Sequence, residues 1–228
     1  MKFDNILVSG CSWGDLDFFS QFHPDMDCSW PKWPNILAEK MNLEPVNLCK
    51  SGAGNEYIYS SISDYLQETP HDEIGYVIAA WSTAPRRCYK IRDRWVNDRQ
   101  DLRGDLPYWI ERSIRTKYAF QNLMEQTKLP YMHLQMISLY RGHLWDLLKK
   151  PTVPYEYKKM KENVLKVLRN TKYKFKDTYV NWPTDEELGG STVEFSVLKE
   201  EHKISDLDRH PNAKGQMKIA EYIYEQLG

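Results

Sequence analysis

Four short apolar runs, separated by stretches with helical spacing, constrain the fold of this chain most strongly. The runs are Phe3–Ser9, Pro45–Cys49, Ile74–Trp81 and Tyr131–Ser138. Runs that are apolar on both faces are typical of parallel strands covered on both sides by helices. Strands that alternate with helices form βαβ units with right-handed crossovers. The pattern therefore predicts an α/β protein, a three-layer α/β/α sandwich around a mainly parallel sheet.

The segments between and after these runs supply the expected helices. Apolar residues at helical spacing predict helices from Trp33 to Met41, Asn55 to Leu66, Arg112 to Thr127 and Ala213 to Leu227. Two stretches fit this pattern poorly, at about 86–111 and 139–206, the second with a lysine-rich helical piece near 155–170. We expect one domain over residues 1–228, with both stretches as insertions over one edge of the sheet, where ligand-binding loops usually lie.

Composition excludes several classes of protein. The 228 residues carry a net charge of −1, so the whole molecule has no strong electrostatic attraction to nucleic acid. No apolar run is long enough to cross a bilayer and no signal peptide is apparent, so a cytoplasmic protein without a membrane partner is expected. The four scattered cysteines predict reduced thiols. Basic residues gather within 86–117 and 149–176, which predicts either a solvated face or a rim that attracts an anionic substrate or partner.

Chemically useful residues follow the ends of the predicted strands. The first strand leads into Ser12, the second into the glycines at 52 and 54, and the third into Ser82. The loop before the last helix carries His210 with Asp206 and Asp208. Ligands bind outside the carboxyl ends of the strands in an open parallel sheet, so these residues are expected on one rim. A serine, glycine amides and an Asp/His pair together indicate nucleophilic acyl transfer.

The order of these residues resembles the SGNH hydrolases, also called GDSL esterases. Gly10-x-Ser12-x-Gly14 also matches the nucleophile elbow of α/β-hydrolases, but several strands precede that elbow and here only one does. Gly10-Cys11-Ser12 stands where SGNH hydrolases often have Gly-Asp-Ser. Their second and fifth blocks resemble Asn47–Gly52 and the stretch from His210 to Gly215. The Trp-Pro pair after the serine and the motif Ser51-Gly52-x-x-Asn55 also resemble motifs of SGNH-type proteins carried by some tailed phages. This resemblance makes a virus-encoded origin one of the expectations.

The resemblance implies a flavodoxin-like sheet and a role for each residue. Ser12 is the expected nucleophile and His210 the expected general base. The backbone N–H groups of Ser12 and Gly52 are the expected oxyanion donors. The family's third block supplies an Asn side chain to the oxyanion hole; Ala80-Trp81-Ser82 occupies that place here, so Ser82 is the candidate third donor.

The acid of the expected site departs from the family pattern. The family has Asp three residues before His, and that position here is Leu207. In an extended segment the side chains of residues 206, 208 and 210 project to the same side. Either Asp206 or Asp208 therefore fits beside the imidazole, and Asp208 is preferred.

The sequence also suggests residues for substrate binding and allows candidate metal ligands to be assessed. Trp13, Asn55, Trp81 and Arg86 are expected to bind substrate, although the Trp residues also suit core packing. His23, Asp25 and Asp27 match no strong metal-ligand pattern, so neither a metal nor an organic cofactor is expected. His143 with Arg141 has no identifiable partner. Oligomeric state is not indicated.

Three functions compete. The first is a serine esterase that removes a small acyl group, such as an O-acetyl group from a carbohydrate. The second is a binding or structural module that kept the SGNH fold and lost catalysis, motivated by the absent block-three Asn and the shifted Asp. The third is transfer of an acyl group to an acceptor other than water.

Overall fold

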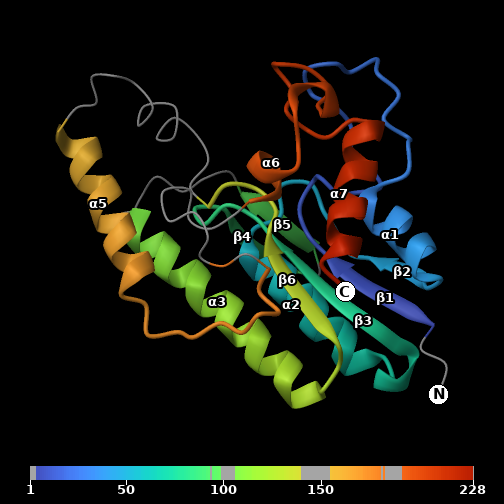
Figure 1. Cartoon of the computed structure of the whole chain (residues 1–228), viewed down its shortest axis with the longest axis horizontal. Helices are drawn as coiled ribbons and strands as arrows, with labels where there is room; N and C mark the ends of the chain where they lie inside the picture. The colour runs from blue at the N-terminus through green and yellow to red at the C-terminus, as the bar shows by residue number, and fades with distance from the viewer. Residues whose placement is uncertain are drawn as a thin grey trace.

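The centre of the protein is a parallel sheet of four strands in the order β2-β1-β3-β6 (Figure 1). The computed structural model describes residues 4–92, 94–98, 106–139, 155–180, 182 and 192–227. The strands are β1 (Asn5–Ser9), β2 (Glu44–Asn47), β3 (Ile74–Trp81) and β6 (Tyr131–Gln135). The register sets Val8 of β1 beside Asn47 of β2 and Ile78 of β3. The four apolar runs of the sequence thus form the sheet.

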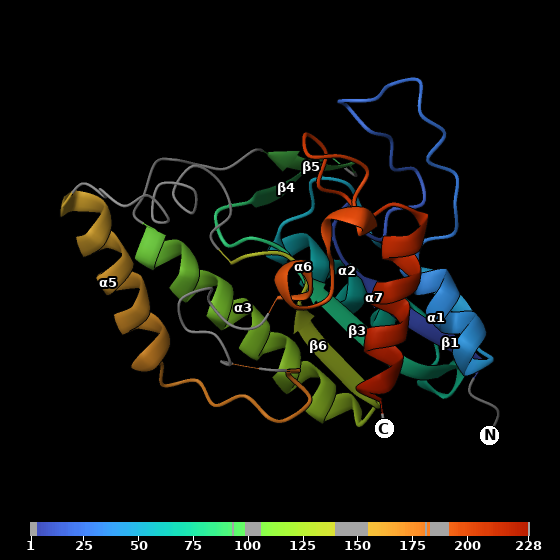
Figure 2. The same ribbon diagram turned by 45° about the horizontal axis from the view of Figure 1, so that its top comes forward.

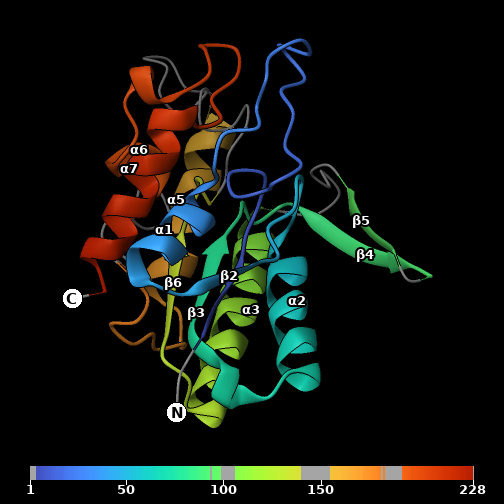
Figure 3. The same ribbon diagram turned by 90° about the vertical axis from the view of Figure 1, so that its right-hand side faces the viewer.

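Helices cover both faces of the sheet, as the double-sided apolar pattern predicts. Figure 3 shows α1 (Trp33–Met41) and α7 (Ala213–Glu225) on one face, and α2 (Asn55–Glu68) and α3 (Leu106–Thr127) on the other. A further helix, α5 (Tyr155–Arg169), packs on α3. The three-layer α/β/α architecture is therefore confirmed.

Single residues extend the sheet beyond β6. His133 forms an isolated parallel bridge with Tyr179, and Gln135 forms one with Thr192. Tyr179 and Thr192, which both follow α5 in sequence, thus lie beside β6 at the edge of the sheet. The described residues also contain the short helical segments η1 (His71–Glu73), α6 (Val193–Ser196) and η3 (Glu200–His202).

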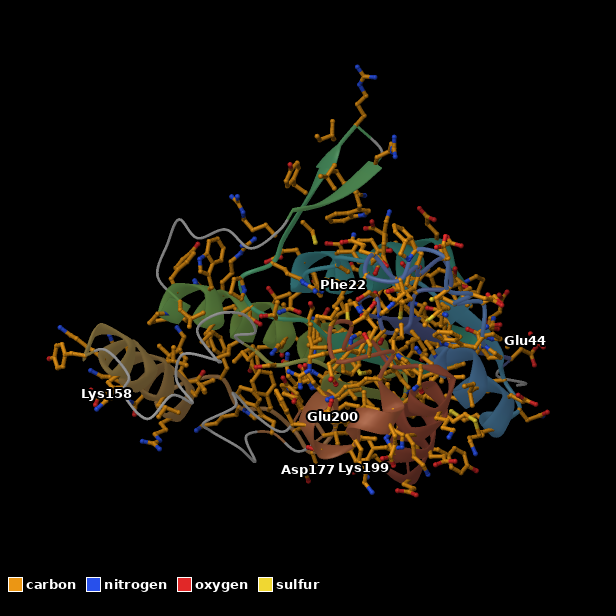
Figure 4. The ribbon with its side chains drawn as sticks, turned by 90° about the horizontal axis from the view of Figure 1, so that it is seen from above. Phe22, Glu44, Lys158, Asp177, Lys199 and Glu200 are labelled. Carbon is orange, nitrogen blue, oxygen red and sulfur yellow. The ribbon has the colours of Figure 1, made fainter. Side chains whose placement is uncertain are left out.

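The first expected insertion contains regular structure that the sequence pattern did not reveal. An antiparallel hairpin, β4 (Arg87–Ile91) with β5 (Arg94–Asp98), projects from the body in Figures 3 and 4. Helix α3 begins at Leu106 rather than at Arg112, because Trp109 and Ile110 continue its buried stripe and Pro107 is tolerated in a first turn.

The second expected insertion is described only in part. The lysine-rich piece forms α5 as expected, and in Figure 4 Lys158 marks the end of the molecule opposite Glu44. Arg141, His143, the three prolines of this stretch and the Gly189-Gly190 pair lie outside the described residues. The division into one domain with two insertions stays a prediction.

A buried polar chain fixes the end of β3. Lys117 of α3 is fully buried and its Nζ donates to Oε1 of Gln135 at 2.5 Å. Burial lowers the pKa of Lys117 to about 7. The amide nitrogen of Gln135 then donates to the carbonyl oxygen of Ser82 at 3.0 Å. This chain ties α3 and β6 to the residue that follows β3.

Candidate active site

The residues singled out at the strand ends meet at the carboxyl edge of the sheet. In Figure 2 the segment after β1 and the segment before α7 lie on the same edge of the molecule. The Oγ of Ser12 and the Nε2 of His210 are 2.8 Å apart, although 198 residues separate them in sequence. The two ends of the chain therefore meet as the sequence order predicts.

The hydrogen bond continues from His210 to Asp208. Nδ1 of His210 lies 2.5 Å from Oδ1 of Asp208, and the backbone N–H of His210 donates to the same oxygen at 3.1 Å. An ionised carboxylate only accepts hydrogen bonds, so Nδ1 carries the proton and Nε2 accepts from the Ser12 hydroxyl. This is the arrangement in which an imidazole can remove the serine proton.

Asp208, rather than Asp206, is the acid beside the imidazole. The side chain of Asp208 is buried, while Asp206 is exposed. Burial raises the pKa of the Asp208 carboxyl, but hydrogen bonds from Ser20 and from the side chain and backbone of His210 outweigh burial and leave the pKa below its usual value. The carboxylate is therefore ionised wherever the imidazole could act as a base.

The loop from His202 to Asn212 fixes this geometry through its backbone. The N–H of Ile204 donates to the carbonyl of His210 at 2.9 Å, and the N–H of Asn212 donates to the carbonyl of His202 at 3.0 Å. The side chain of Asn212 caps α7, because its Oδ1 accepts from the N–H of Gly215 at 3.0 Å. The start of α7 thus anchors the loop that carries Asp208 and His210.

Gly215 allows the start of α7 to lie close to the backbone of His202, because glycine has no side chain. A Cβ atom at this position would lie 2.2 Å from the carbonyl oxygen of His202 and 2.8 Å from Cβ of Pro211. We expect Gly215→Ala to destabilise the fold by about 2–3 kcal/mol, because backbone must move to admit the methyl group. The melting temperature should fall by about 4–12 °C. Lys214→Ala, an exposed neighbour in the same turn, should melt like the wild type, and equal melting of both variants would contradict the crowding.

The loop after β2 presents Gly52 at the site. Gly52 has φ 78°, a left-handed conformation that glycine adopts without strain. The backbone N–H of its neighbour Ser51 donates to Oδ2 of Asp15 at 2.7 Å, so the segment after Ser12 holds this loop in place. Ser12, Ser51 and Gly52 all line one pocket with Asp208 and His210. An amide of Gly52 in this position suits an oxyanion hole.

Ser82 does not line that pocket. It is fully buried, its N–H donates to Oδ1 of Asn55 at 2.9 Å, and its Oγ accepts from Arg86 at 2.8 Å. Arg86 does line the pocket, and its Nη1 also donates to the carbonyl of Ala53 at 3.3 Å. Arg86, unlike Ser82, therefore lines the same pocket as the candidate nucleophile.

Three of the expected substrate-binding residues lie in the interior. Trp13 and Trp81 are 1% and 0% exposed and belong to the hydrophobic core. Asn55 is also buried, and its Nδ2 donates to Oγ of Ser113 at 2.7 Å. None of the three is among the residues that line the pocket. Among the four expected residues, Arg86 alone reaches the pocket.

Aromatic residues that the sequence reasoning missed complete the pocket. The cavity, of about 190 Å³, is lined by Phe18, Phe19 and Phe22 in addition to the polar residues. The ring of Phe18 packs on the His210 imidazole with centroids 4.4 Å apart. Phe19 and Phe22 are more than half exposed. The signal available was their position, in a long non-helical segment directly after the candidate nucleophile.

Two of the residues considered as metal ligands, His23 and Asp27, have other contacts. Nε2 of His23 lies 2.7 Å from Oγ of Ser205, and Oδ1 of Asp27 accepts from the N–H of Ser29 at 2.9 Å. Within the described ranges, no three His, Cys, Asp or Glu side chains are grouped so as to hold a metal ion. All four cysteines are free and buried. Among the described helices, none combines the length and apolarity needed to cross a membrane.

Comparison with known proteins identifies the fold. No family model matches the sequence, and no curated protein is significantly similar to it. Among solved structures, the esterase EstA from Pseudoalteromonas sp. is 13% identical with a TM-score of 0.51, covering 98% of this chain and 96% of that one. TesA is 13% identical with a TM-score of 0.53, covering 98% of each chain. A protein from Slackia heliotrinireducens, assigned provisionally to the SGNH hydrolases, is 13% identical with a TM-score of 0.48 over both whole chains.

These likenesses span nearly the whole chain. The protein has the α/β/α fold of the SGNH hydrolases, with the parallel sheet and two helical layers described above. At 13% identity the likeness establishes the fold alone, so the activity has to come from the chemistry of the site.

Proposed function

We propose that this protein is a serine ester hydrolase that acts through Ser12, His210 and Asp208. The observation that carries the proposal is the continuous line of hydrogen bonds from the Ser12 hydroxyl through the His210 imidazole to the Asp208 carboxylate. A serine that is hydrogen-bonded to a base, which is in turn hydrogen-bonded to an orienting acid, is typical of an activated nucleophile. A module that had lost catalysis would have no need of this alignment.

The proposed reaction has two halves. Nε2 of His210 removes the hydroxyl proton of Ser12 while Oγ attacks the carbonyl carbon of an ester. The tetrahedral intermediate collapses, the imidazolium gives its proton to the departing alcohol, and an acyl-enzyme remains. Water then attacks the acyl-enzyme with His210 again as the base, which releases the acid and restores Ser12. Asp208 holds the tautomer and stabilises the imidazolium throughout.

The oxyanion is proposed to form beside Gly52 and Arg86. The backbone N–H groups of Ser12 and Gly52 are two donors, as the resemblance implies. Arg86 lines the same pocket and is anchored through Ser82 and Ala53. We therefore assign to the Arg86 guanidinium the third donor role that an Asn side chain fills in the family. A positive group at this point also stabilises the developing negative charge.

The size of the pocket favours a small acyl group. Its volume of about 190 Å³ lies below the roughly 300–1,000 Å³ of pockets that enclose drug-sized ligands. The exposed rings of Phe19 and Phe22 at its rim offer apolar faces to the alcohol part of the ester. An O-acetylated carbohydrate, whose ring can stack on such faces, is the first substrate class to test.

The test combines turnover with covalent labelling. We expect the purified protein to hydrolyse p-nitrophenyl acetate faster than p-nitrophenyl octanoate, and to release acetate from an acetylated monosaccharide. A fluorophosphonate probe should label Ser12, located by peptide mass spectrometry, and Ser12→Ala should not be labelled. Folded protein that neither turns over acetate esters nor takes the label would reject the proposal, while product analysis with added alcohols separates hydrolysis from acyl transfer.

A further inference from the structure

The segment that follows the candidate nucleophile also contacts the far side of the acid. The hydroxyl of Ser20 donates to Oδ2 of Asp208 at 2.5 Å, and both side chains are at most 2% exposed. The other carboxylate oxygen, Oδ1, accepts from Nδ1 and the backbone N–H of His210. Both oxygens of Asp208 therefore have assigned donors, and Ser20 supplies the one that faces away from the imidazole.

The direction of the Ser20 hydroxyl is itself fixed. Its oxygen accepts from the backbone N–H of His23 at 3.1 Å, so a turn within residues 20–23 holds the oxygen while the hydrogen points to the carboxylate. A hydroxyl can rotate to suit any acceptor, but an ionised carboxylate in a buried site is the strongest one within reach. The contact therefore stabilises the charged form of Asp208 more than the neutral form.

The same segment holds the backbone of the acid loop. Nε2 of His23 lies 2.7 Å from Oγ of Ser205, and that oxygen accepts from the backbone N–H of Asp208 at 3.0 Å. The N–H of Ser205 in turn donates to the carbonyl of Asp208 at 3.0 Å. Residues 20–23 thus contact Asp208 directly through its side chain and indirectly through its backbone.

We propose that Ser20 is a positioning residue of this site, whose hydroxyl holds the Asp208 carboxylate in the rotation that presents Oδ1 to His210. The inference rests on the proposed ester hydrolysis for its kinetic meaning, but the contact itself exists independently of any substrate. Ser20 is not among the residues that line the pocket, so it acts through Asp208 rather than on the substrate.

Removal of the hydroxyl has a kinetic consequence with a defined sign. In Ser20→Ala, Oδ2 of a buried carboxylate loses its donor, and a hydrogen bond to a charged group carries enough energy for a tenfold to hundredfold effect on rate. We expect kcat for p-nitrophenyl acetate to fall by about that factor with KM nearly unchanged, because no substrate contact is lost. Ser20→Cys, a weaker donor of similar size, should be intermediate, and Ser20→Thr should recover most of the rate.

The pH profile separates positioning from simple stability. Ser20 is the first of the groups that lower the pKa of Asp208 against burial, so the alanine variant should take up the proton on Asp208 at a higher pH. His210 is the titratable group bonded to this carboxylate, and His23 reaches the same loop through Ser205. We expect the acid limb of the kcat profile to move to higher pH in Ser20→Ala, because the Asp208–His210 pair titrates as a coupled unit.

The control variant breaks a serine–serine contact elsewhere in the fold. Ser61→Ala removes a hydroxyl that lies 2.8 Å from Oγ of Ser9 and touches neither Asp208 nor the pocket. It should keep the wild-type kcat and pH profile. A Ser20→Ala protein with unchanged rate and profile would overturn the proposal, and so would one with a lower rate, a lower melting temperature and an unmoved acid limb.

A second measurement keeps the inference testable if the protein hydrolyses no ester. Carboxyl carbon NMR of the Asp208 side chain, assigned with Asp208→Asn, follows its titration directly in wild type and Ser20→Ala. A titration that moves to higher pH in the variant supports the contact, and superimposable titrations overturn it. Absence of turnover and of Ser12 labelling would count against the proposed function alone.

Discussion

Ser12→Ala is expected to lower kcat/KM for p-nitrophenyl acetate by a factor on the order of 10⁴ or more, with His210→Ala nearly as damaging. The hydroxyl of Ser12 and the Nε2 of His210 share one hydrogen bond of 2.8 Å, so either change removes the same activated nucleophile. The double variant should therefore be little slower than each single one, because the residues act as a unit. Steady-state kinetics on the three variants, with melting curves to confirm folding, measures this.

Two neighbouring aspartates provide a matched control for that series. Asp208→Asn keeps the shape of the side chain but removes the charge that fixes the His210 tautomer, and it should cost several orders of magnitude in kcat. Asp206→Asn makes the same change two residues earlier, at an exposed side chain, and should stay within about twofold of the wild type, as usual for surface changes. Full activity in Ser12→Ala, or equal effects of the two asparagine variants, would show that the hydrogen-bonded line is not the reaction centre.

The second large effect is expected at Arg86. Arg86→Gln should lower kcat for p-nitrophenyl acetate by about 10²–10³, the usual result of deleting one oxyanion donor. The loss should fall mainly on kcat, because the oxyanion forms only in the transition state. The ester is neutral, so a residue that merely attracts anionic substrates would leave this reaction almost unchanged. Arg86→Lys, which keeps the charge but not the planar fork, should recover part of the rate.

Arg94→Gln is the matched control for Arg86→Gln. It removes the same charge from an exposed position on the β4–β5 hairpin, outside the pocket lining. It should change kcat less than twofold, as expected for a surface substitution. If Arg86→Gln behaves like Arg94→Gln on the neutral ester, the third oxyanion donor is not Arg86. A rise in KM confined to anionic esters would instead assign Arg86 to substrate recognition.

The predictions from sequence were most accurate for strands and helices that have a regular pattern of apolar residues. The four apolar runs became the four strands within a few residues. Three of them, β1, β3 and β6, are largely buried, and a strand covered on both faces must be apolar throughout. The start of α3 was missed by six residues, since Trp109 and Ile110 were read as part of an aperiodic insertion. The hairpin of β4 and β5 was also missed, because its strands are short, partly exposed and rich in charge.

At the candidate site, the order of the residues relative to the strands and helices predicted which side chains meet. The spacing between neighbouring residues did not predict which side chains point into the pocket. Ser12 and His210 follow the first strand and precede the last helix, and parallel topology brings such positions to one edge of the sheet. The sequence favoured Asp208 over Asp206 only slightly, because both side chains project to one side of an extended segment. Trp13, Asn55 and Trp81 were expected at the pocket, but each lies in the interior. Burial of the two Trp rings removes apolar surface from water, and the buried Asn55 side chain is hydrogen-bonded to Ser113 and Ser82.

By itself the sequence determined the α/β/α layers, the edge of the sheet where the candidate site lies, and the two residues, Ser12 and His210, whose side chains meet there. Those features depend on the spacing of apolar residues and on the order of strands and helices, and both can be read from the sequence. Only the tertiary structure decided that Arg86 rather than Ser82 lines the pocket, that Asp208 rather than Asp206 lies beside His210, and that Ser20 donates to the second carboxylate oxygen of Asp208. These choices depend on how side chains from segments up to 188 residues apart turn toward one another in a packed interior, and no local pattern encodes that packing.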